Sequence, residues 1–524
     1  MKSFKYILAS LIVVASLASC VNDLNVTPID PNMNTADKAF NSAADFDAFL
    51  AGIYTGYATS GYKGRDDDPS ISGLDGGMSQ YIRGLFHLCE LSTDVYVCGW
   101  NDEGVPDVCK MQWDASTGLI YSIYSRMFFQ IAQCNEFIRQ ARSSNIAMPR
   151  KDEWVAEART LRALSYYHAI DNFGNVPFSD ETSVVGQIPQ RITRADLYTW
   201  LETELLDIIN NSALADRSAT EYGRINKTAA KMILAKLYLN AKVYTGTAQW
   251  DKCANVLKDI MDDGYSLHTT SVGGVYSPYQ ELFLADNDKR TDEIIFAIEQ
   301  DGIETMSYGV TDYLIFAFAG GTMDTATDLG TSSGWSGCRM TPEFYAKFSS
   351  NDDRAIFWTD GQTVDVADMG DFSNGIAFQK YKNLTSTNDR GKADGCPDTD
   401  FPMFRYADVL LMAAECAMNG ASSISQTEGL GYLNEVRERA GLLPATALNA
   451  DLILDERARE LYLELWRRQD LIRYNRFTTA DYVWQWKGGV HDGQAVEDYK
   501  NLYPIPVSDM MVNPNLVQND GYKK

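Results

Sequence analysis

The sequence has few of the residues that common catalytic sites require. Only four of its 524 residues are histidines, at scattered positions, and none lies in an H-E-x-x-H pattern. A zinc hydrolase would therefore lack most of its usual ligands. The chain also lacks a G-x-x-x-x-G-K-[ST] phosphate loop, which argues against a nucleotide hydrolase of that class.

Positive charge is also scarce. The chain has 46 Lys and Arg residues against 71 Asp and Glu residues, a net charge of −25. This sign excludes a typical nucleic-acid-binding surface and disfavours anionic polymers and anionic membranes. Apolar residues make up 45% of the chain, enough for a large folded core. A neutral or cationic ligand fits best, and a surplus of 29 Tyr over 22 Phe is typical of surfaces that bind polar ligands.

Long hydrophobic runs are missing beyond the first twenty residues. These read MKSFKYILASLIVVASLASC: two lysines, a short apolar run, and small residues followed by Cys20. This pattern predicts a bacterial lipoprotein signal peptide over residues 1–19, an acylated Cys20, and a tether over residues 20–40. An ordinary signal peptide followed by a chance cysteine is the alternative.

The eight remaining cysteines form no C-x-x-C pair. Cys89, Cys134, Cys253 and Cys416 lie in apolar, helix-like contexts that predict packed thiols. Cys98 and Cys109 are close enough in the chain to pair, but their spacing leaves the question open.

Apolar residues recur at helical spacing in several blocks. The predicted helices cover residues 118–142, 152–171, 196–210, 226–243, 248–262, 404–419, 428–440 and 451–474. Alanines at closely spaced positions in these blocks indicate stacked helix–turn–helix units of the tetratricopeptide kind. Long polar loops separate the blocks, and such loops are usually functional. We expect a mostly α fold, with a single domain over residues 41–524.

Five ordered motifs carry a family resemblance over the whole chain. They lie at residues 24–31, 157–177, 404–412, 456–474 and 503–519. With them the chain resembles the RagB/SusD family of surface glycan-binding lipoproteins. The resemblance implies a tetratricopeptide-like helical scaffold, mainly at 118–262 and 402–480, with ligand-face loops and a few short strands, mainly at 60–117 and 300–345. It also implies non-catalytic glycan capture at the cell surface of the outer membrane, in partnership with a SusC-type TonB-dependent transporter.

Local matches are most similar to starch-binding members of the family, in which an arc of aromatic rings follows an α-glucan. The resemblance assigns the arc rings to Trp100, Tyr308 and Trp335. It assigns polar contacts with glucose hydroxyls to Asp75, Arg83, and Asn101 or Glu103. Two positions depart from the starch binders: Cys98 replaces a second arc tryptophan, and Glu103 replaces an asparagine. Losing one ring would cost about 1 kcal/mol of binding energy, so a shifted glycan preference stays open.

Further expectations concern a metal and the buried charges. Asp286, Asp288, Asp398 and Asp400 lie in two acidic loops that resemble a structural Ca²⁺ site of this sub-family, and carboxylate oxygens suit Ca²⁺. Charged residues at 467–473 predict an ion-pair network around Asp470 that locks the last helix to the scaffold.

Two other functions stay open beside starch binding. Binding of a different neutral glycan is the nearer alternative. A lipid-anchored glycoside hydrolase is the more distant one. It stays open because acidic residues are abundant, and counting them cannot exclude a catalytic pair of carboxylates. A periplasmic binding protein fits less well, since such proteins alternate strands and helices.

Overall fold

The computed structural model describes residues 39–62, 64–65 and 69–523. The predicted signal peptide, Cys20 and nearly all of the predicted tether lie outside these residues. The longer helices are α3 (Ala43–Thr55), α6 (Gly118–Ser143), α7 (Lys151–Asn172), α8 (Arg194–Asn211), α9 (Lys227–Leu239), α11 (Trp250–Met261), α16 (Tyr406–Met418), α17 (Gln426–Arg439) and α18 (Ala450–Leu461). Across the described part of the chain, we find no helix with the length and apolar character needed to cross a membrane.

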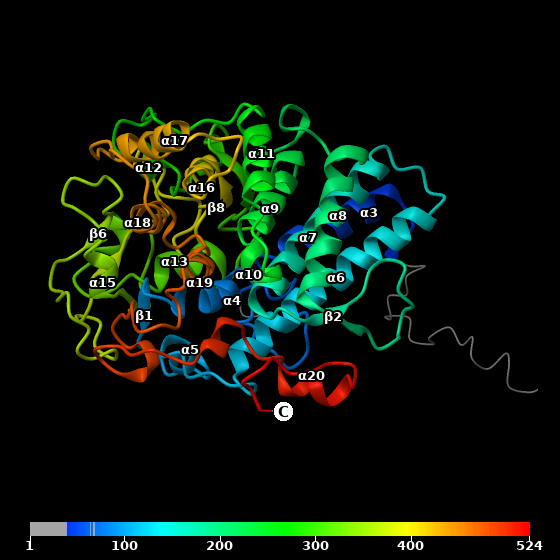
Figure 1. The fold of residues 1–524 in the computed structure, drawn as a ribbon, viewed down its shortest axis with the longest axis horizontal. Coiled ribbons are helices and arrows are strands. Elements are labelled where there is room, and N and C mark those ends of the chain that lie inside the picture. Colours follow the sequence, from blue (N-terminus) through cyan, green and yellow to red (C-terminus); the bar gives the residue numbers. More distant parts are fainter. Residues whose placement is uncertain (1–38, 63, 66–68, 524) are drawn as a thin grey trace, which may run out of the picture.

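Consecutive long helices pack on one another and build the scaffold (Figure 1). Helix α6 packs on α7, α7 on α8, α8 on α9, and α9 on α11. Helix α16 then packs on α11 and carries α17 and α18 on its other sides. The predicted alanine contacts are present, since Ala230, Ala235, Ala413 and Ala414 are fully buried. This arrangement confirms the prediction of a mostly α fold with stacked helix pairs.

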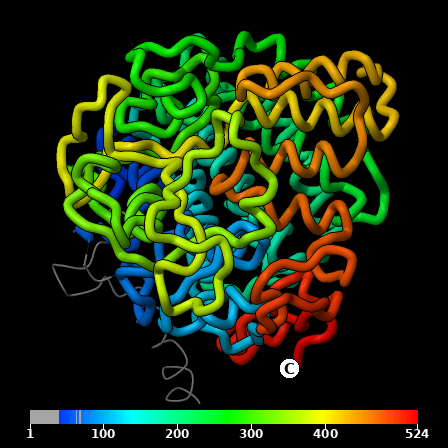
Figure 2. The backbone as a smooth tube through the Cα atoms, turned by 90° about the vertical axis from the view of Figure 1, so that its left-hand side faces the viewer, coloured from blue at the N-terminus to red at the C-terminus, as the bar shows by residue number. Residues whose placement is uncertain are grey.

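The described strands are short and pair in twos. The antiparallel pairs are β1 (Tyr96–Cys98) with β5 (Cys338–Met340), β2 (Val176–Phe178) with β3 (Gln190–Ile192), β4 (Ile294–Ile298) with β8 (Phe401–Arg405), and β6 (Phe357–Trp358) with β7 (Ala377–Phe378). Short helices fill the intervening loops: α4 (Tyr81–Phe86), a π-helix (His87–Leu91), α5 (Val105–Cys109), α10 (Ala241–Thr245), α12 (Pro278–Glu281), α13 (Val310–Phe316), α14 (Thr325–Asp328), α15 (Pro342–Tyr345), α19 (Arg467–Arg473) and α20 (Val507–Val512). The loop-rich chain around residues 350–400, yellow-green in Figure 2, packs against the orange helix α18, for example through the ion pair of Arg354 with Glu456 at 2.7 Å.

The prediction of one helix over residues 451–474 is wrong. The structure has α18 and α19, separated by a bend at which Leu463 and Leu465 take positive φ angles of 56° and 77°. Groups in the bend have partners in distant segments of the chain. The Leu465 N–H donates to Glu90 Oε1 at 2.8 Å, and the Glu464 carboxylate accepts from Lys380 Nζ at 2.6 Å. These contacts offset the cost of left-handed backbone at non-glycine residues.

Two other helix boundaries also differ from the prediction. The helix expected at 226–243 breaks at Asn240 into α9 and α10. The helix expected from 404 begins at Tyr406, because residues 401–405 form β8 against β4. Strand pairing between distant segments thus overrides the local pattern.

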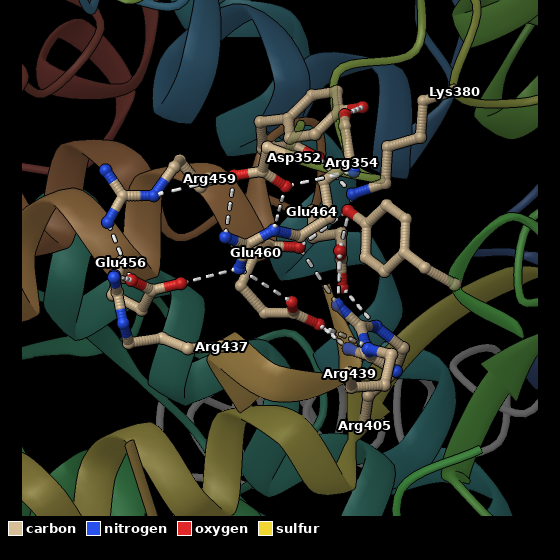
Figure 3. Close-up of polar contacts among 12 residues, drawn as sticks. Asp352, Arg354, Lys380, Arg405, Arg437, Arg439, Glu456, Arg459, Glu460 and Glu464 are labelled. Carbon is tan, nitrogen blue, oxygen red and sulfur yellow. Dashed lines mark hydrogen bonds and ion pairs between the residues drawn. The ribbon is translucent and has the colours of Figure 1, made fainter. Parts of the chain in front are cut away.

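A buried network of ion pairs joins the second half of the scaffold (Figure 3). Its side chains come from β8, α17, α18, the bend after α18 and the loops at 352–354 and 380. Arg405 lies at its centre and contacts Glu293 at 2.5 Å, Glu460 at 3.0 Å and Glu464 at 2.8 Å. Buried charges are tolerated only when each one is paired. The network therefore fixes how these segments fit together.

The predicted network around Asp470 is present but wider than expected. Asp470 pairs with Arg473 and with Arg457 of α18, each at 2.8 Å. Arg467 reaches Asp94 at 2.7 Å, after the π-helix, and Arg468 reaches Asp171 of α7 at 3.3 Å. Helix α19 is thus tied to segments hundreds of residues earlier.

The buried carboxylates predict loss of stability in acid. Burial alone would raise the pKa of Glu460, but the charges of Arg439, Arg405 and Arg354 outweigh it and lower that pKa to about 2. Burial opposes the shift at Asp408 too, yet Lys236 and Arg457 lower its pKa to about 2. A carboxylate with a lowered folded-state pKa stabilises the fold above its unfolded pKa, and this stability is lost as pH falls toward the folded value.

We therefore expect the melting temperature to fall steeply between about pH 4.5 and pH 2. Each carboxylate contributes about 3 kcal/mol at most to this loss. Burial raises the pKa of Glu90 to about 8. Below pH 4.5 this carboxyl is protonated in both the folded and the unfolded chain, so it does not contribute to the loss of stability in acid. Thermal melts across pH 2–7 measure the effect, and a flat curve below pH 4.5 would contradict it.

Candidate functional site

The β1–β5 pair brings two tryptophans together from distant parts of the chain. Trp100 follows the end of β1, and Trp335 precedes the start of β5. Because the two strands are antiparallel, these segments leave the pair at the same end. The ring centroids of Trp100 and Trp335 lie 6.1 Å apart with a 52° tilt, and the Trp100 indole N–H points to the Trp335 carbonyl oxygen at 3.4 Å.

Tyr308 adds a third ring beside Trp335. Its ring centroid lies 5.7 Å from that of Trp335, in an edge-on arrangement. All three rings are partly exposed. We call Trp100, Tyr308 and Trp335 the ring cluster. The structure thus brings together the three aromatic residues that the sequence singled out.

Trp100 can lie this close to the chain only because residue 337 is glycine. A Cβ atom on Gly337 would lie 2.1 Å from Cε2 of the Trp100 ring. Any side chain here would displace the indole. Glycine is the usual residue where a ring must lie directly against the backbone, because it has no Cβ atom.

The ring cluster rests on buried groups that the sequence did not single out. Phe316 stacks behind Trp335, with ring centroids 5.2 Å apart. The Tyr313 ring lies 6.3 Å from Trp100 and 4.9 Å from the Arg83 guanidinium. The apolar run at 313–318 signals burial in the sequence, but nothing in it shows which rings it supports.

Arg83 lies beneath the ring cluster rather than on its open face. Its side chain is buried, and its guanidinium donates to the carbonyl oxygens of Gly77 at 2.7 Å and Tyr308 at 3.1 Å. Burial lowers its pKa. In this structure Arg83 fixes the backbone that carries Tyr308.

Arg65 and Asp312 extend this support, and sequence reasoning missed both. The Arg65 guanidinium lies 4.8 Å from the centroid of the Tyr308 ring and 3.6 Å from the Asp312 carboxylate. Burial raises the pKa of Asp312 well above its usual value, against the opposing charges of Arg65 and Arg83. Arg65 thus covers part of Tyr308.

The other polar candidates lie beside the ring cluster. Asp75 is exposed and accepts from the backbone N–H groups of Gly77 and Met78 at 2.7 and 3.0 Å. Asn101 and Glu103 are exposed on the loop after Trp100. Asp75 and Glu103 line a groove of about 730 Å³. Its other walls include Tyr121 of α6 and Met511 of α20, and we call it the α20 groove.

Cys98, which the resemblance matched to an arc tryptophan, is buried in β1. It therefore contributes nothing to the exposed face.

The four aspartates of the expected calcium site do not converge. Asp286 accepts from the Ser386 N–H and hydroxyl at 2.8 and 2.7 Å, and Asp398 accepts from the Gly302 N–H at 2.8 Å. The Asp400 carboxylate accepts from the Gln300 N–H and the Tyr222 hydroxyl, and the charge of Asp288 on the neighbouring turn repels it. Among residues 39–62, 64–65 and 69–523, no group of three or more His, Cys, Asp or Glu side chains is placed to hold a metal ion. The donors in this structure do not fit the Ca²⁺ assignment.

One serine has the spacing of a hydrolase nucleophile. Gly330-Thr331-Ser332-Ser333-Gly334 fits the pattern G-x-S-x-G. A nucleophile elbow requires a strand before the serine and a helix after it, whereas this segment is an irregular loop between α14 and β5. The Ser332 hydroxyl donates to the Asp394 carbonyl oxygen at 3.3 Å. The segment therefore lacks the geometry of an elbow.

Solved structures share this architecture of stacked helices. Surface glycan-binding protein A from Bacteroides uniformis matches with a TM-score of 0.71 and 21% identity, over 91% of this chain and 99% of its own. Surface glycan-binding protein A from Bacteroides thetaiotaomicron, in complex with laminarihexaose, matches with a TM-score of 0.70 and 20% identity, over 91% of this chain and all of its own. These likenesses define the fold class.

Sequence comparison goes further. The chain is 32% identical to the starch-binding protein SusD of Bacteroides thetaiotaomicron, with 98% of both chains covered. A sequence model of the SusD family matches residues 357–522. The chain therefore belongs to the SusD family, as the five motifs indicated. The starch-binding relative and the surface glycan-binding proteins are named for binding rather than for a reaction, which confirms the prediction that the chain is not an enzyme.

Proposed function

We propose that this protein binds starch-like α-glucans at the ring cluster without altering them. The observation that carries the proposal is the convergence of three partly exposed rings, Trp100, Tyr308 and Trp335, on one face. Sugar rings have apolar C–H faces that stack on aromatic faces, and a rigid ring loses little entropy on binding. The relative that is 32% identical is named as starch-binding, and the net charge of −25 suits a neutral ligand.

The cellular role follows from the same proposal. Acylated Cys20 would anchor the protein to the outer membrane at the cell surface, since stable anchoring needs more than one acyl chain. The bound glycan would be delivered to a SusC-type TonB-dependent transporter. Palmitate labelling of the wild-type protein but not of a Cys20→Ala variant tests the anchor.

A direct test compares binding with hydrolysis. Isothermal titration with maltoheptaose, laminarihexaose and cellohexaose is expected to give a signal with maltoheptaose, with no release of reducing sugar on prolonged incubation. Binding confined to laminarihexaose would favour the alternative of another neutral glycan, consistent with the shortened arc at Cys98. Release of reducing sugar would contradict a binding-only role.

We predict that the α20 groove makes affinity depend on chain length. Glu103 lies on the loop after Trp100, and Asp75 caps the turn beside Tyr308. Both residues line the α20 groove. A glycan chain that extends beyond the ring cluster would therefore enter this groove. Glu103→Ala should weaken maltoheptaose binding about three- to tenfold, as expected for one hydrogen bond. Maltotriose, which the ring cluster alone accommodates, should bind as before.

Two further variants sharpen this experiment. Glu103→Asn restores the residue of the starch binders, keeps an acceptor and should retain the affinity for maltoheptaose. Asp107→Ala removes an exposed acid of α5 that does not line the groove and is the matched control. Equal losses for maltotriose and maltoheptaose in Glu103→Ala would remove the groove from the proposal.

A further inference from the structure

Two cysteines face each other directly behind the ring cluster. Cys98 ends β1 and Cys338 begins β5, and the two residues are opposite partners in the antiparallel register. Cys98 precedes Trp100 by two residues, and Cys338 follows Trp335 by three. Both side chains are buried, with exposed fractions of 2% and 0%. Neither thiol takes part in the binding site described above.

The hydrogen bonds around the pair define its geometry. The neighbouring residues Gly99 and Gly337 form the bonded rung, since the Gly99 N–H donates to the Gly337 carbonyl oxygen at 2.9 Å. The Cys338 N–H donates instead to the Ala317 carbonyl oxygen at 2.8 Å. Cys98 and Cys338 are thus a non-hydrogen-bonded antiparallel pair. Such pairs have Cα atoms about 4.5 Å apart and side chains on the same face of the ladder.

This separation suits a covalent link. Disulfides join cysteines whose Cα atoms lie about 4.4–6.8 Å apart. The Cys98 side chain is in contact with Cys338: burial raises the pKa of the Cys98 thiol, and the adjacent Cys338 thiol raises it further. Cys109 also approaches Cys98 and forms a hydrogen bond with the Cys98 backbone, but it is not a partner of Cys98 in the strand register. The register therefore favours Cys338 over Cys109 as the partner of Cys98.

We propose that Cys98 and Cys338 are joined by a disulfide once the chain is exported. The oxidant is an external disulfide, such as oxidised glutathione or a dithiol oxidase. One cysteine thiolate attacks this disulfide, forms a mixed disulfide with one half of the oxidant and releases the other half as a thiolate. The second cysteine thiolate then attacks the protein sulfur of the mixed disulfide and releases the remaining half of the oxidant as a thiolate. Two protein thiols are oxidised and one external disulfide is reduced to two thiols. Because both side chains are buried in the folded chain, the link forms while the chain folds.

The link braces the ring cluster. It lies at the end of the strand pair from which the Trp100 and Trp335 segments leave, so it holds the two backbones in register behind the rings. The structure contains a second contacting thiol pair, Cys253 of α11 and Cys416 of α16. Those residues lie on facing helices far from the rings and are the natural internal comparison.

Peptide mapping tests the assignment on the wild-type protein. Protein exported to a bacterial periplasm is purified without reductant, alkylated in denaturant, digested and analysed by mass spectrometry. The expected result is a linked peptide pair that contains Cys98 and Cys338, with Cys89, Cys109, Cys253 and Cys416 alkylated. Alkylation of Cys98 and Cys338, or a link to any other cysteine, would overturn the proposal.

Melting experiments supply a second readout. A reductant should lower the melting temperature of the wild-type protein by a few degrees, because it removes a cross-link that closes a very long loop. Cys98→Ala and Cys338→Ala should no longer respond to the reductant, whereas Cys109→Ala and Cys253→Ala should respond as the wild type does. The same drop in Cys98→Ala as in the wild type would contradict the proposal, whatever glycan the protein binds.

Discussion

Replacing Trp335 with alanine should weaken glycan binding about thirtyfold or more and abolish retention on an amylose gel. Trp335 lies at the centre of the ring cluster, in contact with Trp100 on one side and Tyr308 on the other. Its loss removes one stacking face and the support of its two neighbours. Central aromatic anchors of this kind contribute about 2 kcal/mol or more to binding, which corresponds to the stated change in the dissociation constant.

Two comparisons separate loss of contact from loss of fold. Trp250→Ala, at a half-buried tryptophan of α11, is the matched control and should bind normally. Gly337→Ala leaves all three rings in the sequence but displaces the Trp100 indole, so it should also weaken binding. Circular dichroism and melting temperature show whether each variant is folded. Unchanged affinity in a folded Trp335→Ala protein would remove the ring cluster as the binding site.

The largest effect on stability is expected from Arg405→Met. Methionine fills a similar volume but leaves Glu293, Glu460 and Glu464 with one cation fewer. Removing one partner from a buried ionic network costs about 3–5 kcal/mol, because the remaining charges are left under-compensated. Urea unfolding followed by circular dichroism measures the change in the free energy of unfolding.

Arg476→Met provides the surface control for this experiment. Arg476 is partly exposed and pairs at 3.3 Å with Asp451, whose side chain is 78% exposed. Exposed pairs contribute less than about 1 kcal/mol, so the unfolding midpoint should barely move. Equal midpoints for Arg405→Met and Arg476→Met would show that the network in Figure 3 contributes little to stability.

The helical half of this fold can be predicted from sequence because its signals are local. The apolar spacing at 118–142 and 152–171 anticipates α6 and α7 to within one residue at each end. The prediction fails where a distant partner decides the backbone. At residues 463–465 the helical pattern continues, but the Leu465 N–H and the Glu464 carboxylate find partners at Glu90 and Lys380. Neither partner is visible from the residues around the bend.

The candidate site shows the same division. The residue types were identified from the resemblance, but the convergence of Trp100 and Trp335 depends on the pairing of β1 with β5 across more than two hundred residues. Nothing in the sequence indicates that Arg83 lies beneath the rings or that Asp75 and Glu103 line the α20 groove. The acidic loops that resembled a calcium site find hydrogen-bond donors within the protein instead. Composition and residue spacing do not show which distant groups a side chain meets in the folded chain.

The ring cluster and the buried ionic network share no residue. Trp100, Tyr308 and Trp335 are carried by loops, whereas Arg405, Glu460 and Glu464 lie in the scaffold. Mutations that reshape the ring face therefore leave the main source of rigidity intact. The curvature of the ring face, and with it the glycan that fits there, is thus free to differ between related proteins without disturbing the paired buried charges.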